Sequence, residues 1–468
     1  MRPSHRRSGS RQRGGLGSSR VCASSRSVEL WLPLETAGTS GLMDVCLRAA
    51  VRMSAKTPSA IPPIARACDL GKVAPTQSCP ARHRQPPFGT PSACNSFASE
   101  PTLRITVVNA ARNYGGQEAM AALLAERLAR RGHEVLFLCR PVYPAMERIP
   151  DGIEVAPVLG GMDWSPLGIW RAREAVGRHG SEVMLVTTNK DLRSAGIAAR
   201  LLGVPVVVRR AMARPLKSSR HYRYLYGALP ERIVVNSRTT RRIMLDSAPW
   251  LDGSSTVVVH NGIDVDRFRG VEPAELRVPA DGVSVGFVGR FVDWKGVLTL
   301  AEAWREVAPS IPRAYLVLVG EGEEEPEMRR RLEGVERVRW LGFREDVPEV
   351  MAALDVLVYP SVMEGFGLAA VEAMASGLPV VAAEAGALPE VVGDGGAGTF
   401  VPPHDPSALA HAIRRLVDDP EARHAMGARG RRRVEEEFDV ERMVDRYEAV
   451  LEEAATSDTA RTMAGATR

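Results

Sequence analysis

The chain has 468 residues, long enough for two or three domains, and a formal net charge of +5 at pH 7. Residues 1–100 carry 14 Lys and Arg against 5 Asp and Glu, whereas the remainder carries 47 against 51. The basic excess belongs to the first hundred residues, so it gives little support for nucleic-acid binding by the rest. Five of the six cysteines also precede residue 100, at spacings that match no metal site and no closed disulfide framework.

The first hundred residues lack the features of a folded domain. They contain no apolar run long enough for a signal peptide or a membrane span, and no periodic apolar pattern. We therefore expect a disordered basic extension over residues 1–100, and keep open a translation start at Met43, Met53 or later, or an organelle transit peptide. The remainder has a single cysteine, Cys139, which is typical of a reduced, cytoplasmic protein.

Strands and helices alternate between residues 101 and 265. The predicted strands are Leu103–Val108, Glu134–Leu138, Val183–Thr187, Val204–Val208, Arg232–Val235 and Thr256–His260. The predicted helices between them include Glu118–Arg131, Ser194–Leu202 and Arg238–Leu245. This alternation favours parallel βαβ units, and therefore an α/β fold with a doubly wound sheet.

The same cycle restarts over residues 266–438. The predicted strands are Val283–Val288, Ala314–Val319, Val338–Leu341, Val356–Tyr359 and Pro379–Ala382. The predicted helices are Leu298–Val307, Pro326–Leu332, Val347–Ala353, one after Gly367 and one after Asp405. Ligands bind at the carboxyl ends of the strands in such sheets, so two Rossmann-like domains facing a central cleft would each offer a site.

A last amphipathic helix is predicted at Val440–Glu453, with apolar side chains at Met443, Tyr447, Val450 and Leu451. We assign it to residues 439–455. The periodicity is lost after this helix, so residues 456–468 are expected to form a disordered tail.

Two glutamates, Glu364 and Glu372, lie eight residues apart just after the strand Val356–Tyr359. Between them the glycine turn Gly365-Phe366-Gly367 leads into a helix-forming stretch. Glycines let the backbone approach a ligand closely, and the free N–H groups at a helix start bind anions. Carboxylates beside an anion site favour a ligand that carries both phosphate and sugar hydroxyls, such as a nucleotide sugar.

Two basic residues follow the strand Val283–Val288. Arg290 and Lys295 come after Gly289, at the strand end where ligands bind in such sheets. A guanidinium offers a planar fork to phosphate oxygens, and an ammonium is a mobile point charge. Together they are suited to neutralise a diphosphate.

The order and spacing of five motifs resemble the retaining glycosyltransferases of family 4, which have the GT-B fold. The likeness extends from Leu103 to about Ala455. Its motifs are Asn113–Glu118, Val235–Ser237, Asn261–Asp264, Gly286–Arg290 with Lys295-Gly296, and the glutamate run from Pro360 to Val381. Asn261-Gly262 follows His260, for which a place in the cleft and a purely structural role stay open.

The resemblance implies roles for these residues. Glu372 would accept hydrogen bonds from two ribose hydroxyls, and Glu364 would contact the donor hexose and act in catalysis with Arg290 and Lys295. The glycine pair Gly115-Gly116 lies between the first strand and the first helix, and it would let that loop approach the donor phosphate or the acceptor from across the cleft; we assign Gly116 to donor binding. Backbone N–H groups at the helix start would bind the sugar and phosphate, namely those of Phe366, Gly367, Leu368 and Ala369. The resemblance also implies retention, no metal and no cofactor, and a last helix that returns to the N-terminal domain.

The acceptor side departs from the family pattern. Many relatives place a histidine after the strand that matches Val204–Val208, where this chain has Arg209 and Arg210. Asn189, Asp191 and Arg210 are therefore the acceptor-side candidates, and no general base is evident.

A basic and aromatic run, residues 209–227, follows this strand. Such a run is typical of a surface that binds anionic lipid headgroups or polyanionic glycans, and single-stranded nucleic acid is bound by similar residues. It is equally typical of a solvated helix whose tyrosines pack inward.

The sequence thus predicts a glycosyltransferase that moves a sugar from a nucleotide-diphosphate donor to a lipid-linked or cell-envelope glycan acceptor, with retention and without a metal. We expect a cytoplasmic protein, in peripheral contact with the inner face of the membrane, that binds no nucleic acid. One alternative is a GT-B nucleotide-sugar epimerase or a sugar-phosphate synthase. An alternative of another class is a non-catalytic glycan- or nucleic-acid-binding protein.

Overall fold

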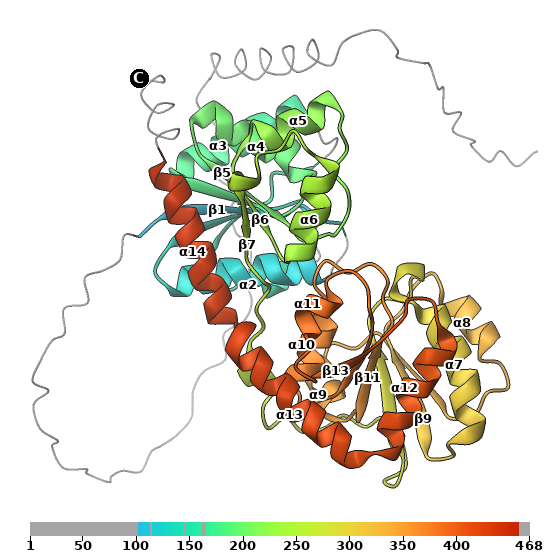
Figure 1. The fold of residues 1–468 in the computed structure, drawn as a ribbon. Coiled ribbons are helices and arrows are strands. Elements are labelled where there is room, and N and C mark those ends of the chain that lie inside the picture. Colours follow the sequence, from blue (N-terminus) through green and yellow to red (C-terminus); the bar gives the residue numbers. More distant parts are fainter. Residues whose placement is uncertain (1–101, 113–114, 144–145, 161–164, 458–468) are drawn as a thin grey trace, which may run out of the picture.

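The computed structural model describes residues 102–112, 115–143, 146–160 and 165–457. Two parallel sheets with helices packed around them form an N-terminal and a C-terminal half (Figure 1). The predicted extension over residues 1–100 and the predicted tail beyond Ser457 lie outside the described residues. The prediction of an α/β fold with two doubly wound sheets is confirmed.

The described residues of the N-terminal half form a seven-stranded parallel sheet in the order β3-β2-β1-β4-β5-β6-β7. Its strands are β1 (Arg104–Val108), β2 (Glu134–Leu138), β3 (Glu154–Ala156), β4 (Val183–Val186), β5 (Val206–Arg210), β6 (Pro230–Val235) and β7 (Thr256–Val258). Its helices are α2 (Gly116–Arg130), α3 (Pro166–His179), α4 (Asp191–Leu202), α5 (Arg220–Gly227) and α6 (Arg238–Ser247).

The C-terminal half forms a six-stranded parallel sheet in the order β10-β9-β8-β11-β12-β13 among its described residues. Its strands are β8 (Val283–Val288), β9 (Ala314–Val319), β10 (Val338–Gly342), β11 (Val356–Tyr359), β12 (Val380–Ala383) and β13 (Gly398–Val401). Its helices are α7 (Val297–Ser310), α8 (Glu325–Arg331), α9 (Val347–Ala352), α10 (Leu368–Ala375), α11 (Leu388–Val392), α12 (Pro406–Asp418) and α13 (Pro420–Glu437).

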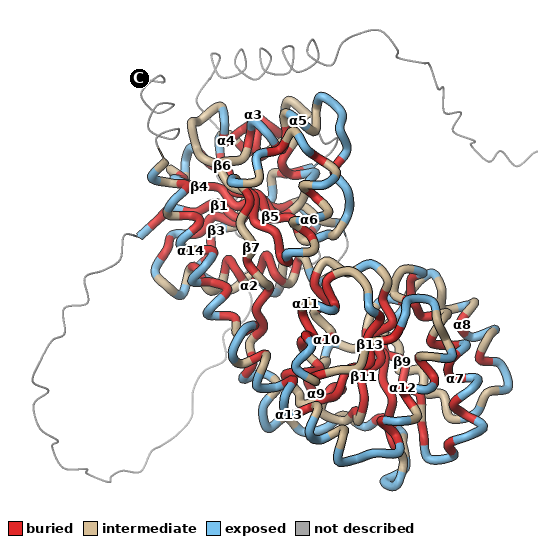
Figure 2. Tube along the Cα trace, viewed as in Figure 1, coloured by how far each residue is buried: buried red, intermediate tan, exposed pale blue. Residues whose placement is uncertain are grey.

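The central strands consist mostly of apolar residues because helices cover both faces of each sheet. Every residue of β4, β8 and β11 is buried, and the buried segments run through the middle of both halves in Figure 2. In the N-terminal half, α2 packs on one face of the sheet and α3 and α4 pack on the other. This arrangement explains why the apolar runs of the sequence predicted the strands.

The last helix, α14 (Val440–Thr456), packs against the N-terminal half although it follows α13 of the C-terminal half (Figure 1). Its residues Met443, Tyr447 and Leu451 are buried in the same core as α2. Arg131, which follows α2, forms an ion pair of 2.7 Å with Glu448 of α14. The amphipathic pattern therefore predicted both the helix and its buried face.

The two connections between the halves run side by side. Ile263 on the first connection accepts a hydrogen bond from Val440 N–H at 3.0 Å and donates one to the Phe438 carbonyl at 2.9 Å. A Cβ atom added at Gly262 would lie 2.7 Å from the Asp439 carbonyl oxygen, so only glycine permits this approach. The chain thus passes between its halves twice at one joint.

Several elements escaped the sequence-based prediction, namely β3, β13, α3, α11 and α13. The strand β3 has only three residues. The helix α13 has 18 residues but buries only Gly427, Gly430 and Val434, so it shows no apolar stripe. Gly427 instead packs on the backbone, where an added Cβ would lie 1.8 Å from the Gly377 oxygen. Periodicity cannot detect helices that pack through glycine.

Candidate functional site

The glycine turn after β11 leads directly into α10. Gly367 adopts a left-handed conformation, with φ of +97°, and α10 begins at Leu368. The first N–H groups of a helix have no partner inside it, so those of Leu368 and Ala369 are available to an anion. Phe366 can contact a ligand only through its backbone, because the residue is 2% exposed and its ring packs edge-on against Phe438.

Glu364 lies in this turn and is held by three side chains through one oxygen. Its Oε1 accepts hydrogen bonds from Tyr359 and Ser361, each at 2.9 Å, and forms an ion pair with Lys295. Burial and the charge of Glu364 raise the pKa of Tyr359, which therefore stays protonated and keeps donating. The sequence had suggested Lys295 and Glu364 separately, but neither their pairing nor the parts of Tyr359 and Ser361.

Lys295 reaches Glu364 because its loop passes close to the end of β11. Gly296 has a φ of +68°, and a Cβ atom there would lie 2.1 Å from the Pro360 oxygen. The ammonium of Lys295 also donates to the Tyr359 hydroxyl at 2.5 Å. Arg290, from the loop after β8, is exposed and forms no ion pair within the described residues.

Glu372 lies on the fifth residue of α10 and is partly buried among apolar neighbours of the same helix. Burial raises the pKa of its carboxyl to about 7, against the opposing charges of Arg267 and Lys295. The carboxyl therefore titrates near neutral pH, which is unusual for a glutamate.

The start of α2 in the N-terminal half touches the start of α10 in the C-terminal half. A Cβ atom at Gly116 would lie 3.1 Å from Cδ1 of Leu368. Beside this contact, a Cβ atom at Gly365 would lie 2.0 Å from the Ala211 carbonyl oxygen, just after β5. The structure therefore brings Gly116 to the glutamate motif, and glycine is what allows both contacts.

A cavity of about 510 Å³ lies in the N-terminal half at the ends of β4 and β5. All three acceptor-side candidates, Asn189, Asp191 and Arg210, line it. Asp191 Oδ2 accepts a hydrogen bond from Ala110 N–H at 2.9 Å and another from the Thr188 hydroxyl at 2.8 Å. Asp191 thus links the loop after β1 to the loop after β4 in the wall of the cavity.

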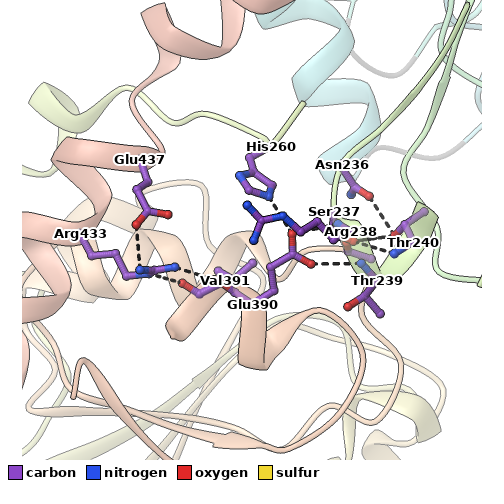
Figure 3. Close-up of polar contacts among 11 residues, drawn as sticks. Asn236, Ser237, Arg238, Thr239, Thr240, His260, Glu390, Val391, Arg433 and Glu437 are labelled. Carbon is purple, nitrogen blue, oxygen red and sulfur yellow. Dashed lines mark hydrogen bonds and ion pairs between the residues drawn. The ribbon is translucent and has the colours of Figure 1, made fainter. Parts of the chain in front are cut away.

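One carboxylate of the C-terminal half holds two segments of the N-terminal half. Figure 3 shows Glu390 of α11 facing the start of α6 and His260. Its oxygens accept hydrogen bonds from Arg238 N–H at 2.9 Å and Thr239 N–H at 3.1 Å, and contact His260 Nε2 at 2.8 Å. His260 therefore lies at the junction of the halves, and its partner Glu390 could not be predicted from the sequence.

The environment of Glu390 favours its charged form. Burial by itself would raise the pKa of this carboxyl, but the hydrogen bonds from His260, Arg238 and Thr239 outweigh burial and lower the pKa. A charged carboxylate at a helix start is also favoured by the helix dipole.

Among the described residues, no three or more His, Cys, Asp or Glu side chains gather in a way that could hold a metal ion. None of the helices in the described part of the chain is both long and apolar enough to cross a membrane.

Two family models match the chain. Residues 114–267 match glycosyltransferase family 4, and residues 282–419 match glycosyl transferases group 1. The matches fall on the N-terminal and the C-terminal half respectively.

Curated relatives are glycosyltransferases. The lipopolysaccharide core biosynthesis glycosyltransferase LpsE of Rhizobium meliloti is 34% identical over 42% of this chain, which spans 57% of that relative's length. The 2-deoxystreptamine glucosyltransferase of Streptomyces kanamyceticus is 31% identical over 53% of this chain and 70% of its own.

Among solved structures, Anabaena Alr3699/HepE in complex with UDP and glucose superposes with a TM-score of 0.63 at 22% identity. The superposition covers 75% of this chain and 99% of that chain. The predicted GT-B fold is confirmed by this likeness.

We expect Glu390→Gln to loosen the junction of the halves. A glutamine has one acceptor oxygen and no charge, so it cannot replace a carboxylate that serves three donors. Charge-assisted hydrogen bonds contribute about 1.5–3 kcal/mol, and a loss of that order in the free energy of unfolding is expected in urea titrations at neutral pH.

The pH dependence gives a second readout of the same variant. Because the pKa of Glu390 is lowered in the folded chain, its contribution is present above the ordinary value of 4.5 and is lost as the pH falls through the lowered one. The control is Glu384→Gln, an exposed glutamate of the same half, which should be nearly neutral. Equal unfolding curves for the two variants would contradict the role given to Glu390.

Proposed function

This chain belongs to the GT-B glycosyltransferases, and we propose that it transfers a sugar from a nucleotide-diphosphate donor to a hydroxyl acceptor with retention of configuration, as a family 4 enzyme. The observation that carries the proposal is the junction at which the start of α10, bearing Glu364 and Glu372, meets Gly116 of the opposite half. The complex of Alr3699/HepE with UDP and glucose supports a nucleotide-linked donor.

In the proposed donor site the diphosphate lies at the start of α10. Backbone N–H groups from Phe366 to Ala369 bind it, and Arg290 and Lys295 neutralise the charge that develops as it leaves. Lys295 is paired with Glu364, which holds the ammonium in place. Such preorganised charge needs little rearrangement during the reaction.

The two glutamates take different parts in this proposal. Glu372 accepts hydrogen bonds from the ribose hydroxyls of the nucleotide. Glu364 lies by the hexose, and its negative charge favours the positive charge that develops at the anomeric carbon. The new bond forms between that carbon and the acceptor oxygen, the bond to the diphosphate breaks, and the hydroxyl proton leaves with the diphosphate.

For the acceptor we propose a lipid-linked or cell-envelope glycan, handled in the cytoplasm at the inner face of the membrane. The likeness to LpsE, a lipopolysaccharide core enzyme, supports the acceptor class. The exposed basic residues of α5, Arg220 and Arg223, support a peripheral contact with anionic lipid. The inward packing of Tyr226, which is 1% exposed, shows that the tyrosines of this run serve partly as core.

A transfer assay with a panel of nucleotide-diphosphate sugars tests the proposal. A transferase releases nucleoside diphosphate in proportion to a new glycoside, whose anomeric configuration NMR spectroscopy then reads. An epimerase or a sugar-phosphate synthase would not give this coupling with a glycan acceptor, and a binding protein would release no nucleotide.

We propose that transfer needs no divalent cation and no cofactor. The proposal rests on Arg290, Lys295 and the helix start, which together supply positive charge to the diphosphate. Transfer is therefore expected to continue in excess EDTA. Complete loss of transfer that Mg²⁺ or Mn²⁺ restores would overturn this proposal.

Replacing either cation should slow the reaction strongly. Lys295→Ala or Arg290→Ala is expected to reduce turnover by at least about 100-fold, the effect of removing one preorganised group that stabilises transition-state charge. Arg432→Ala is the matched control, because Arg432 is an exposed arginine on α13, outside the proposed site. Near-normal turnover in either of the first two variants would contradict the assignment to the diphosphate.

Donor binding should depend on the protonation of Glu372. A carboxylate accepts hydroxyl hydrogen bonds, so the KM for the donor should rise as the pH falls through about 7, where this carboxyl titrates. Glu372→Gln should raise KM by about 10- to 150-fold with a smaller effect on kcat, and should remove this pH dependence. Steady-state kinetics with the donor varied provide the measurement. A fall in kcat at unchanged KM would mean that Glu364 and Glu372 exchange roles.

A further inference from the structure

The cavity of the N-terminal half is strongly basic. Among the described residues, five cationic side chains and one carboxylate line it: Arg112, Arg140, Lys190, Arg209, Arg210 and Asp191. Asp191 accepts hydrogen bonds from Ala110 and Thr188, and these two donors partly compensate its negative charge. A concave site lined mainly by one sign of charge attracts ions of the opposite sign.

Two of these cations are buried yet incompletely paired. Arg209 and Arg210, at the end of β5, are 2% and 5% exposed. Arg209 donates from Nη2 to Asn261 at 2.8 Å, and Arg210 donates from Nη2 to the Arg214 carbonyl. Nε and Nη1 of Arg209 and Nε of Arg210 make no well-formed hydrogen bond with a partner among the described residues. The hydroxyl of Tyr447 lies near the Arg209 guanidinium and interacts with it.

The neighbours of Arg209 compensate its charge only in part. The charge of Arg209 lowers the pKa of Glu118 on α2 and of Tyr447 on α14, but burial has the larger effect and raises the pKa of both groups. Burial therefore disfavours the negative charge that would compensate Arg209. Buried donors without partners are energetically unfavourable, so their retention at a cavity wall points to a ligand that completes them. Guanidinium forks match the oxygens of phosphate in geometry and charge.

We propose, resting on the glycosyl transfer proposed above, that the acceptor carries a phosphate group and that Arg209 and Arg210 bind this phosphate in the cavity. Arg112 and Lys190 are exposed and Arg140 is partly buried, so these three add attraction around it. The two arginines thereby set acceptor specificity. The phosphate belongs either to a soluble ester or to a lipid headgroup.

Calorimetric titration of the full chain tests the proposal in the presence of saturating UDP, which occupies the donor site and keeps phosphate from binding there. The soluble probes are inorganic phosphate and glycerol 3-phosphate, each compared with glycerol. The lipid probes are phosphatidylcholine vesicles with and without phosphatidic acid. We expect inorganic phosphate, glycerol 3-phosphate and the vesicles with phosphatidic acid to bind, and glycerol and the pure phosphatidylcholine vesicles not to bind. Tighter binding of the soluble ester or of the vesicles then shows which of the two is the source of the phosphate.

Variants then locate the site. Arg209→Met and Arg210→Met should each weaken phosphate binding by about tenfold or more, and leave UDP binding unchanged. Arg210→Lys should fall between, since it keeps the charge and loses the fork. The control is Arg171→Met on α3, an exposed arginine that does not line the cavity.

The outcomes separate the two proposals. Absence of binding of UDP, GDP and ADP alike by the unmodified chain would count against the proposed function, and a chain that binds GDP or ADP instead is titrated with that nucleotide in place of UDP. UDP binding without any preference for phosphate-bearing probes, or equal phosphate binding by all the variants, would overturn the phosphate site and leave the transferase proposal intact. Arg209 also donates a hydrogen bond to Asn261, so its replacement could disturb the fold. UDP binding by each variant shows whether that variant is folded. If Arg209→Met does not fold, the result for Arg210→Met decides the test.

Discussion

The contact between the glycine turns of the two halves is the constraint on which the site depends. Gly365 meets Ala211 at a distance that excludes a side chain, and Gly116 lies in tight contact with the side chain of Leu368. Each turn follows a strand of its own parallel sheet, so the carboxyl ends of strands from both halves converge there. The starts of α2 and α10 meet as well, which places two positive helix ends at one point. A substrate with a diphosphate is the kind of ligand that such a junction favours.

Both halves contribute charged side chains around this junction. The C-terminal half supplies Glu364, paired with Lys295, and Glu372, whose carboxyl titrates near neutral pH. The N-terminal half supplies a basic cavity that contains Arg209 and Arg210. Under the proposed function the first set handles the donor and the second the acceptor. The separation keeps the acidic side chains near the sugar and away from the anionic end of the acceptor.

The sequence predicted the fold well because the strands of a buried parallel sheet are apolar throughout, as in Val183–Val186 of β4. It predicted Glu364 and Glu372 because the glycine turn and the helix start are local features. It could not predict contacts between distant residues. Glu390 and His260 lie 130 positions apart, and only the folded chain shows that they meet. The sequence likewise showed Tyr359 only as the last residue of a strand, because the hydrogen bond that its hydroxyl donates to Glu364 forms only in the folded chain.

Arg209 connects the cavity of the N-terminal half with the joint between the halves. Its Nη2 donates to Asn261, which precedes Gly262 on the first connection. The next residue, Ile263, is hydrogen-bonded to Phe438 and Val440 on the second connection. Arg209, which lines the cavity, is therefore hydrogen-bonded to a residue that lies two positions before Ile263, where the two connections are joined. A ligand that completes the hydrogen bonds of Arg209 would fix the guanidinium, and through Asn261 it would also fix the joint on which the meeting of the two glycine turns depends.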